Sequence, residues 1–397
     1  MGASKSDVAA SESVVSGHTG RMLAVLTAGL ATAKLGRYLL PPLLPVVIDS
    51  LSISPVRAGF VLTALSLFYG LSQYVGGRYA DQLSKKTVLV GAYGFILVGY
   101  LVIGGTVAYA ALVLGAVVVG TGMGLYGPAD RALVSDLFRR RRGLAFGINV
   151  TGTELGGVVG AGLAAVALAT VGWRAGFLSL VPLGAVVVLS LHHWGREPYV
   201  RRAVPLGLRD TVARLSSGGY GPIVAVYVLF AFIGQSVVGF LPTLLQADLG
   251  FGSTAASLTY ASVFAVGFLA KPAGGWLSDR GSRLSVAVGA FAVGLLGLGL
   301  LVLSASVPLA VVGTVVFALG HRSFPPVMQA YLMDSFPDES MGGDLGAIRT
   351  VYIGLGSLGP TYVGLVASRA DYTTAYAGLA VCFVVGIVLL LRQRSRA

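Results

Sequence analysis

The sequence predicts an all-α membrane protein with twelve transmembrane helices arranged as two pseudo-symmetric six-helix bundles. The first observation is composition: 55% of the 397 residues are hydrophobic and 11% are charged, less than half of the roughly 25% found in soluble domains. The second is a series of apolar runs, each long enough to span a bilayer. The third is an internal repeat that relates the two halves of the chain.

Apolar runs of spanning length occur six times on each side of a polar stretch at 195–220. A spanning helix requires roughly 20 mostly apolar residues, whereas a transmembrane β-barrel would show alternating strands of about 10 residues. The predicted helices are 21–45, 55–77, 87–107, 109–134, 143–169, 173–193, 221–245, 255–277, 284–305, 307–333, 344–368 and 372–391. The predicted organisation is a tail over 1–20, a first bundle over 21–194, a central loop over 195–220, a second bundle over 221–392 and a tail over 393–397.

Lysine and arginine in the connecting segments predict how the chain lies in the membrane, because basic loops stay on the cytoplasmic side. The tails are basic, and one set of connections contains Lys85, Lys86, Arg139 to Arg142, Arg196, Arg201, Arg202, Arg209, Arg214, Arg280 and Arg283. The opposite connections contain only Arg57, Arg174 and Arg369. We therefore expect an integral protein of the cell membrane with both termini in the cytoplasm.

The net charge of +12 has a topological explanation, so we expect no nucleic-acid partner. In a soluble protein this charge would indicate nucleic acid, but the positive-inside pattern fully accounts for the run Arg139 to Arg142. Cys382 is the only cysteine, which excludes an intrachain disulfide and a cysteine-based metal site. The sequence shows no nucleophile, metal or phosphate-binding constellation. We expect no metal, no cofactor and no enzymatic activity.

The two halves share a repeat at an offset of 198 residues. The second predicted helix ends with GGRYADQLSK from Gly76, and the eighth ends with GGWLSDRGSR from Gly274. At the same offset, Pro128, Ala132, Asp136 and Phe138 map onto Pro326, Ala330, Asp334 and Phe336. Two separate segments with one offset indicate a duplicated six-helix unit.

These repeated segments resemble the signature loop of the major facilitator superfamily, which follows the second and eighth helices. The resemblance rests on Gly77, Asp81 and Lys85, on the second copy from Gly274, and on the start of the sixth helix around Trp173. It implies a secondary active transporter in a lipid bilayer, whose two bundles rock about a midplane site by alternating access. It also implies that the first, fourth, seventh and tenth helices line the cavity.

The signature loops predict a gate at the cytoplasmic side. Gly77 and Gly275 allow close helix approach, and Asp81 and Asp279 can cap a helix or pair with a cation across the two halves. Such pairs would form when this side is closed and break when it opens; the alternative is a static cap and topology signal. The candidate gating residues are Gly77, Asp81, Lys85, Asp130, Arg131, Gly275, Asp279, Arg280 and Arg283.

Charged residues deep inside predicted helices are costly and mark functional sites. Five cations and one acid lie there: Lys34, Arg37, Lys271, Arg322, Arg349 and Glu154. By the resemblance, Arg37 and Arg322 come from pseudo-equivalent helices and can converge on one ligand. Several cations with one carboxylate suit a small organic or inorganic anion. Gln235 and Tyr38 are further candidate substrate contacts, with packing as the alternative.

Glu154 is the candidate proton carrier, because the charge of a buried carboxylate depends on the cations beside it. His321 could also titrate, with packing as the alternative, and the lack of a cluster of deep acids disfavours sodium coupling. A purely structural interpretation pairs Glu154 with Arg37 or Arg349. Under another structural interpretation, the side chains of Lys271 and Arg349 extend to the membrane–water interface on the cytoplasmic side.

Two further functions stay open beside transport of an anion by a monomer. One is export of hydrophobic or drug-like compounds, which a cationic cavity disfavours for cationic drugs. The other is a transporter-like receptor without flux. Ligand binding without counterflow would indicate the receptor, and a drug-susceptibility panel would indicate the exporter.

Overall fold

The computed structural model describes residues 13–200, 202, 221–335 and 341–395, and every regular element among them is a helix. Twelve helical spans in this part of the chain are long and apolar enough to cross a membrane. The prediction of twelve spanning helices is therefore confirmed. Most of the predicted central loop lies outside the described residues, so that domain boundary stays a prediction.

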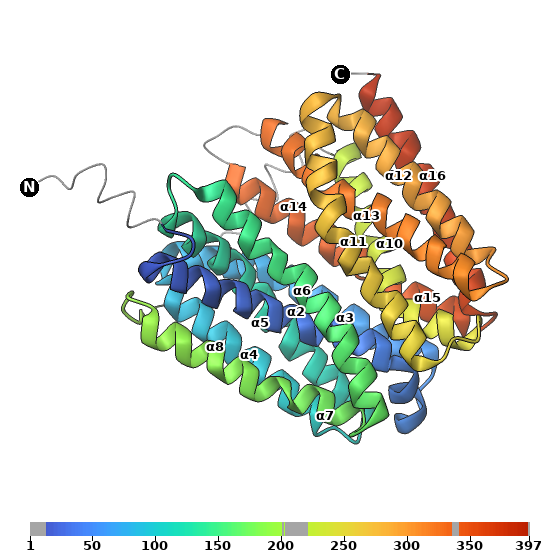
Figure 1. Cartoon of the computed structure of the whole chain (residues 1–397), viewed down its shortest axis with the longest axis horizontal. Coiled ribbons are helices and arrows are strands. Elements are labelled where there is room, and N and C mark those ends of the chain that lie inside the picture. Colours follow the sequence, from blue (N-terminus) through green and yellow to red (C-terminus); the bar gives the residue numbers. More distant parts are fainter. Residues whose placement is uncertain (1–12, 201, 203–220, 336–340, 396–397) are drawn as a thin grey trace, which may run out of the picture.

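The first half contains six spans, whose order along the chain is traced by colour from blue to green in Figure 1. Its helices are α2 (Gly17–Leu51), α3 (Pro55–Gln82), α4 (Lys85–Gly104), α5 (Tyr109–Leu137), α6 (Arg142–Ala169), α7 (Trp173–Leu178) and α8 (Leu180–Trp194). The predicted sixth helix is thus two helices in succession, α7 and α8, which together form one span.

The second half repeats this plan. Its helices are α10 (Gly221–Ala247), α11 (Ser253–Arg280), α12 (Arg283–Val302), α13 (Val307–Ser335), α14 (Met341–Gly356), α15 (Gly359–Ala367) and α16 (Tyr372–Arg394). The predicted eleventh helix is divided into α14 and α15. Pro360 lies in the first turn of α15, a position that proline favours because its missing N–H needs no partner there.

The two signature loops are tight turns closed by equivalent serines. Ser84 accepts a hydrogen bond from Thr87 N at the start of α4, and Ser282 accepts one from Ser285 N at the start of α12. Each serine satisfies a backbone donor that the helix leaves free. Because Ser282 lies 198 residues after Ser84, the sequence repeat is also a repeat of local structure.

Close helix approach occurs at glycines one residue before those predicted. A Cβ added to Gly76 would lie 2.8 Å from Leu125 Cα, and one added to Gly274 would lie 2.5 Å from Ser323 O. These glycines let α3 pack on α5 and α11 pack on α13. The expectation of close approach at Gly77 and Gly275 is wrong, because a Cβ there would meet only Pro128 Cβ at 3.9 Å or nothing within 4 Å.

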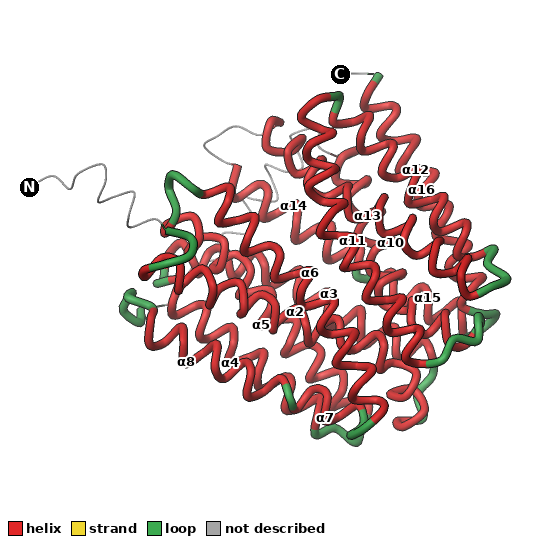
Figure 2. Tube along the Cα trace, viewed as in Figure 1, coloured by secondary structure: helices red, strands yellow, loops and turns green. Residues whose placement is uncertain are grey.

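The two halves meet tightly at the end of the molecule that lies away from both termini. Thr63 Oγ1 on α3 donates to Ser357 O at 2.6 Å and lies 2.8 Å from Thr361 Oγ1. A Cβ added to Gly59 would lie 2.4 Å from Pro360 O. We call this the closed end. At the other end, which carries both termini and which we call the basic end, the halves spread apart (Figure 2).

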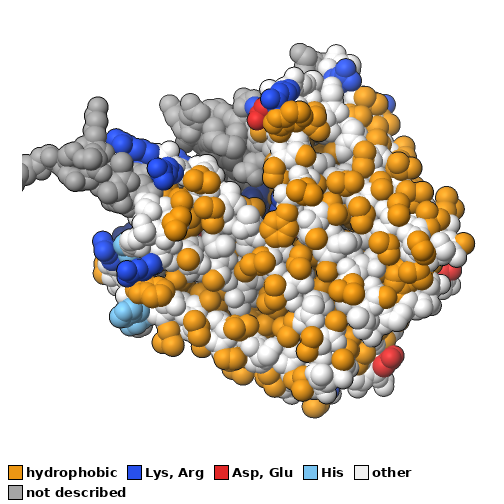
Figure 3. Space-filling model, viewed as in Figure 1, with side chains coloured by type: hydrophobic (Ala, Val, Ile, Leu, Met, Phe, Trp, Pro, Cys, Tyr) orange, Lys and Arg blue, Asp and Glu red, His pale blue; other side chains and the backbone are white. Residues whose placement is uncertain are grey.

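The outer surface is suited to a membrane. Hydrophobic side chains cover the visible middle of the molecule, and basic side chains gather at the basic end (Figure 3). Exposed apolar residues such as Leu269, at 76% exposure, and Leu189, at 65%, lie on the outside of the helices. Soluble monomers rarely expose so much apolar surface, whereas a bundle surrounded by lipid does.

Candidate functional site

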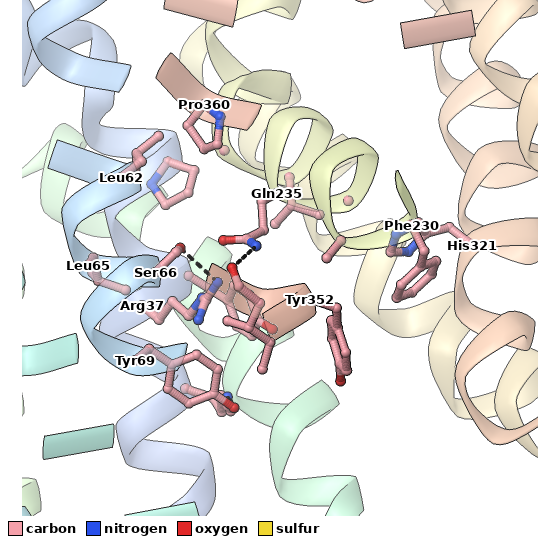
Figure 4. A pocket seen from close by; sticks show the side chains of 18 of the residues that line it. Arg37, Leu62, Leu65, Ser66, Tyr69, Phe230, Gln235, His321, Tyr352 and Pro360 are labelled. Atoms are coloured by element: carbon pink, nitrogen blue, oxygen red, sulfur yellow. Dashed lines mark hydrogen bonds between the residues drawn. The ribbon is translucent and has the colours of Figure 1, made fainter. Parts of the chain in front are cut away.

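A cavity of about 240 Å³ lies between the two halves. Figure 4 shows side chains from both halves pointing into it, with Arg37 and Tyr69 opposite Phe230 and Tyr352. Its charged lining residues are four cations: Lys34, Arg37, Arg322 and Arg349. Within the described part of the chain, the lining contains no carboxylate. The helices that supply it include α2, α10 and α13, as the family resemblance implied for the first, seventh and tenth spans. The expectation for the fourth span is not met here, because α3, α14 and α15 complete the described lining and α5 contributes no residue to it.

Three of the cavity cations surround Tyr69 of α3. Lys34 Nζ donates to the Tyr69 hydroxyl at 3.2 Å and lies 4.4 Å from the ring centroid. Arg37 Cζ lies 5.0 Å from the same ring, and Arg37 Nη2 donates to Ser66 Oγ at 3.1 Å. Arg349 shares the wall, and its Nε has no hydrogen-bond partner among the described residues. We call Lys34, Arg37 and Arg349 the cation cluster.

Arg322 connects the cavity to Glu154 of α6. Arg322 Nη1 lies 3.6 Å from Glu154 Oε1, and Lys271 Nζ of α11 donates to the same oxygen. Glu154 is 2% exposed, and both of its cations come from the other half. The structural alternative that paired Glu154 with Arg37 or Arg349 is wrong, because helix rotation turns Lys271 and Arg322 toward it instead.

The remaining predicted contacts lie in or beside the cavity. Gln235 Nε2 donates to Ile353 O at 3.3 Å, and Tyr38 packs on Phe264 with ring centroids 4.4 Å apart. Both line the cavity. The His321 ring stacks on Phe230 with centroids 4.3 Å apart, and neither ring nitrogen has a partner among the described residues. This stacking is what the packing interpretation of His321 expects.

Two adjoining chambers border the cavity. One, of about 460 Å³, lies toward the basic end and is lined by Gly77, Asp81 and Arg131. The other, of about 230 Å³, lies mainly within the first half and is lined by Asp130, Arg131 and Lys271. Arg349 lines the cavity and both chambers. The expectation that Arg349 and Lys271 extend to the interface is wrong, because both side chains turn inward.

The contacts that the described gating residues make at the basic end lie within one half. Lys85 Nζ forms an ion pair with Asp136 Oδ2 at 2.9 Å, within the first half. Arg283 Nη1 donates to Ala330 O at 2.6 Å, and the Arg280 guanidinium lies 3.9 Å from the Trp276 ring centroid. Asp279 and Gly275 lie near this end of α11, and Asp279 is exposed. A latch between the halves therefore stays a prediction for the opposite conformation.

Asp130 and Arg131, two further predicted gating residues, form side-chain hydrogen bonds within the first half. Asp130 is 1% exposed, and Asn149 Nδ2 donates to its Oδ1 at 3.2 Å. Arg131 Nη2 donates to Gln73 Oε1 at 3.1 Å.

Among the described residues, no group of three or more His, Cys, Asp or Glu side chains could hold a metal ion.

Sequence reasoning missed Tyr69, Ser66, Gln73 and Asn149. Each is polar but uncharged and lies on an apolar helix, so hydropathy gives no reason to single it out. The available signal was relative position: Tyr69 and Ser66 are three residues apart and share a helix face. Only the packing of α2 against α3 shows that this face meets Lys34 and Arg37.

Two helical bundles that enclose a cavity with cationic side chains in its wall, within a lipid-facing shell, define a class, the membrane transporters built from two halves. The profile of the Major Facilitator Superfamily matches residues 26–352 and 223–397. The chain therefore belongs to the Major Facilitator Superfamily, as the signature loops indicated. Members of this family move solutes across membranes, so the protein is a transporter.

Relatives and solved structures agree with this assignment. The chain is 31% identical over 389 residues to the MFS-type transporter YhhS of Escherichia coli (strain K12), with 94% of this chain and 89% of YhhS covered. It is 22% identical over 253 residues to the hexuronate transporter of Bacillus subtilis (strain 168), with 59% of this chain and 58% of that transporter covered. The nucleoside transporter NupG has the same fold, with a TM-score of 0.79 and 14% identity. The alignment covers 94% of this chain and 99% of NupG.

A bacterial homologue of the human lysosomal transporter Spinster also shares the fold. Its inward-facing, unoccupied structure aligns with a TM-score of 0.73 and 18% identity, covering 94% of this chain and 95% of the homologue. At these identities the likeness concerns the fold alone. The substrate has to be argued from the cavity of this chain.

Proposed function

We propose that this protein is a secondary active transporter of a small organic anion, coupled to protons through Glu154. The observation that carries the proposal is the charge of the cavity wall, whose described residues include four cations and no carboxylate. Buried charges without partners are costly. An anionic ligand would relieve that cost, whereas a cationic ligand would increase it.

The rest of the wall favours an anion with an organic body. Phe230, Tyr352 and Val238 also line the cavity, and Figure 4 shows Phe230 and Tyr352 across from Arg37. Apolar and aromatic surfaces bind a carbon skeleton, while a few placed polar groups fix its orientation. The B. subtilis hexuronate transporter is by name a carrier of sugar acids, and a hexuronate is an organic anion of this kind. A carboxylate on a compact skeleton is therefore the substrate class that we propose.

Alternating access explains the two ends of the molecule. The closed end is sealed by direct contact between α3 and α15, while chambers lead from the cavity toward the basic end. If the basic end faces the cytoplasm, as the positive-inside pattern predicts, this conformation is open to the inside. We expect the monomer to be the transporting unit, because both halves of the site come from one chain.

Ligand binding to detergent-purified protein tests the proposal. Glucuronate, benzoate, phosphate and a lipophilic cation are compared by the rise in melting temperature that each produces, since a ligand of the folded state stabilises it by mass action. We expect a carboxylate to stabilise the wild type. Arg37→Gln should weaken that carboxylate's binding at least about tenfold, because it removes a buried charge partner.

The matched control is Arg57→Gln. Arg57 lies at the closed end, over the Tyr109 ring at 5.4 Å, and does not line the cavity, so binding should be unchanged. Stabilisation by the lipophilic cation alone would overturn the proposal and favour an exporter of drug-like compounds. Unchanged uptake into proteoliposomes in both Arg37→Ala and Arg322→Ala would also overturn it.

A further inference from the structure

Glu154 holds two cations from the other half of the molecule through one oxygen. Its Oε1 contacts Lys271 Nζ and lies 3.6 Å from Arg322 Nη1. Its Oε2 has no hydrogen-bond partner among the described residues. A Cβ added to Gly267 would lie 2.5 Å from Oε2, so the missing side chain of Gly267 provides the space that this oxygen occupies. Oε2 is therefore the atom at which Glu154 can accept a proton without losing Lys271.

Arg322 has two possible anionic partners. It lines the substrate cavity, and its guanidinium lies 4.7 Å from the Phe264 ring centroid. The 3.6 Å separation from Glu154 Oε1 is beyond hydrogen-bond distance, and Arg322 Nε has no partner among the described residues. Arg322 is thus held loosely by Glu154 and keeps donors for a ligand. A guanidinium binds a carboxylate best through two parallel hydrogen bonds, a geometry that Glu154 does not provide.

We propose that Glu154 and the substrate's anionic group compete for Arg322, so that protonation of Glu154 releases Arg322 to the substrate and makes this transporter a proton–anion symporter. This inference rests on the proposed function. One proton binds Glu154 Oε2, and the O–H bond is the only covalent bond that forms. Protonation neutralises Glu154, and the negative charge of the substrate then replaces that of Glu154 as the partner of Arg322. The substrate and the proton then favour each other's binding, and linkage makes this effect reciprocal.

The surroundings of Glu154 support this exchange. Lys271 and Arg322 are the charged groups within ion-pair distance among the described residues. Helices packed near α6 bring further charged or titratable side chains to the surroundings of Glu154. These side chains are Lys34, Arg37, Tyr38, Asp130, Tyr260 and His321. Lys34 and Asp130 have hydrogen-bond partners of their own, Tyr69 and Asn149. Asp130 lies on the chamber side, away from the cavity lining that contains Arg322.

The sign of coupling follows from the charge of the ligand. A cationic ligand would compete with the proton for Glu154 itself, which is the logic of an antiporter. An anionic ligand instead competes with the ionised Glu154, so its affinity rises when Glu154 is neutral. The geometry at Arg322 therefore favours symport for the substrate class that the cavity wall indicates.

The test is the pH dependence of binding, measured with glucuronate or benzoate, whichever stabilises the wild type more. In wild-type protein we expect affinity to rise as pH falls, by up to about tenfold per pH unit, since one proton is linked to binding. Glu154→Gln mimics the protonated state. It should bind the anion about as tightly at neutral pH as the wild type does at low pH, with no pH dependence.

Controls separate this inference from a folding defect and from failure of the proposed function. Glu154→Gln/Lys271→Gln removes the tight pair as a unit and should keep the high, pH-independent affinity. Weaker binding in both variants, or a pH dependence that persists in them, would refute the competition. Such a result would leave the anion proposal standing as long as Arg37→Gln still loses binding. A wild-type protein that binds neither carboxylate would instead refute the proposed function.

Discussion

At the scale of single residues, the cation cluster is a costly feature of the molecule. Lys34 donates to the hydroxyl of Tyr69 and Arg37 donates to that of Ser66, so neither is held by a carboxylate in these contacts. Cation–π and neutral hydrogen-bond contacts compensate only part of the cost of burying a charge. Under the proposed function, the cluster gives up stability so that an anion can bind.

Neutralising one cluster member should therefore stabilise the empty protein. Arg349→Gln removes a half-buried charge whose Nε has no hydrogen-bond partner among the described residues, and we expect the melting temperature of ligand-free protein to rise by about 1–3 °C while anion binding is lost. The matched control is Arg174→Gln. Arg174 donates to Thr106 O at 2.7 Å, so that variant should melt at a lower temperature. A lower melting temperature for Arg349→Gln would mean that Arg349 is structural.

At the scale of helices, glycine decides which faces can meet. The α3 face at the closed end approaches α15 so closely that the missing Gly59 side chain leaves room for Pro360 O. Gly364 has the same role, since its added Cβ would lie 2.3 Å from Pro55 O. In a membrane, the hydrophobic effect does not drive helices together, because lipid tails are as apolar as the side chains. Helix association therefore relies on close backbone packing, which small residues allow. The closed end therefore depends on two small residues, one on each helix.

A larger side chain at Gly59 should open this end. In Gly59→Val the backbone of α15 has to move away, and we expect faster hydrogen–deuterium exchange over residues 357–364, measured by mass spectrometry. Gly91→Val is the matched control, because nothing lies within 4 Å of a Cβ at Gly91 on the outside of α4. Equal exchange in Gly59→Val and wild type would show that this contact does not hold the halves together.

At the scale of the whole molecule, the two halves are joined at one end and by the Glu154 contacts at mid-depth. The chambers that border the cavity lie between these contacts and the basic end. Rocking of the halves would have to break the Thr63 and Gly59 contacts and form new ones near Asp81 and Asp279. The gating residues predicted from the sequence would then act in a conformation different from this one.

Reagent access should report this asymmetry. In a Cys382→Ser background, Gln329→Cys, which lines the 460 Å³ chamber, should react with a membrane-impermeant maleimide added to inside-out vesicles. Thr63→Cys, which is 5% exposed at the closed end, should react poorly from either side. Labelling of Gln329→Cys only in intact cells would mean that the basic end faces outward and would reverse the predicted orientation.

The sequence predicted the fold because hydropathy and repetition are local properties. Spans of about 20 apolar residues, the 198-residue offset and the signature loops each require only the order of residues. The internal breaks after Leu178 and Gly356 were missed, because each span stays apolar through the break. Several site residues were also identifiable, since a charge inside an apolar helix is conspicuous: Lys34, Arg37, Glu154, Lys271, Arg322 and Arg349.

By itself, the sequence determined that the chain is a twelve-helix membrane protein of two related halves with an excess of buried cations. Only the tertiary structure decided which cations meet which partners. Glu154 pairs with Lys271 and Arg322 rather than Arg37 or Arg349, and close approach occurs at Gly76 rather than Gly77. The physical reason is rotation: one residue turns a helix face by about 100°, and packing between helices fixes that rotation. Tyr69 becomes part of the site for the same reason, because its helix face is set by contacts with the rest of the bundle.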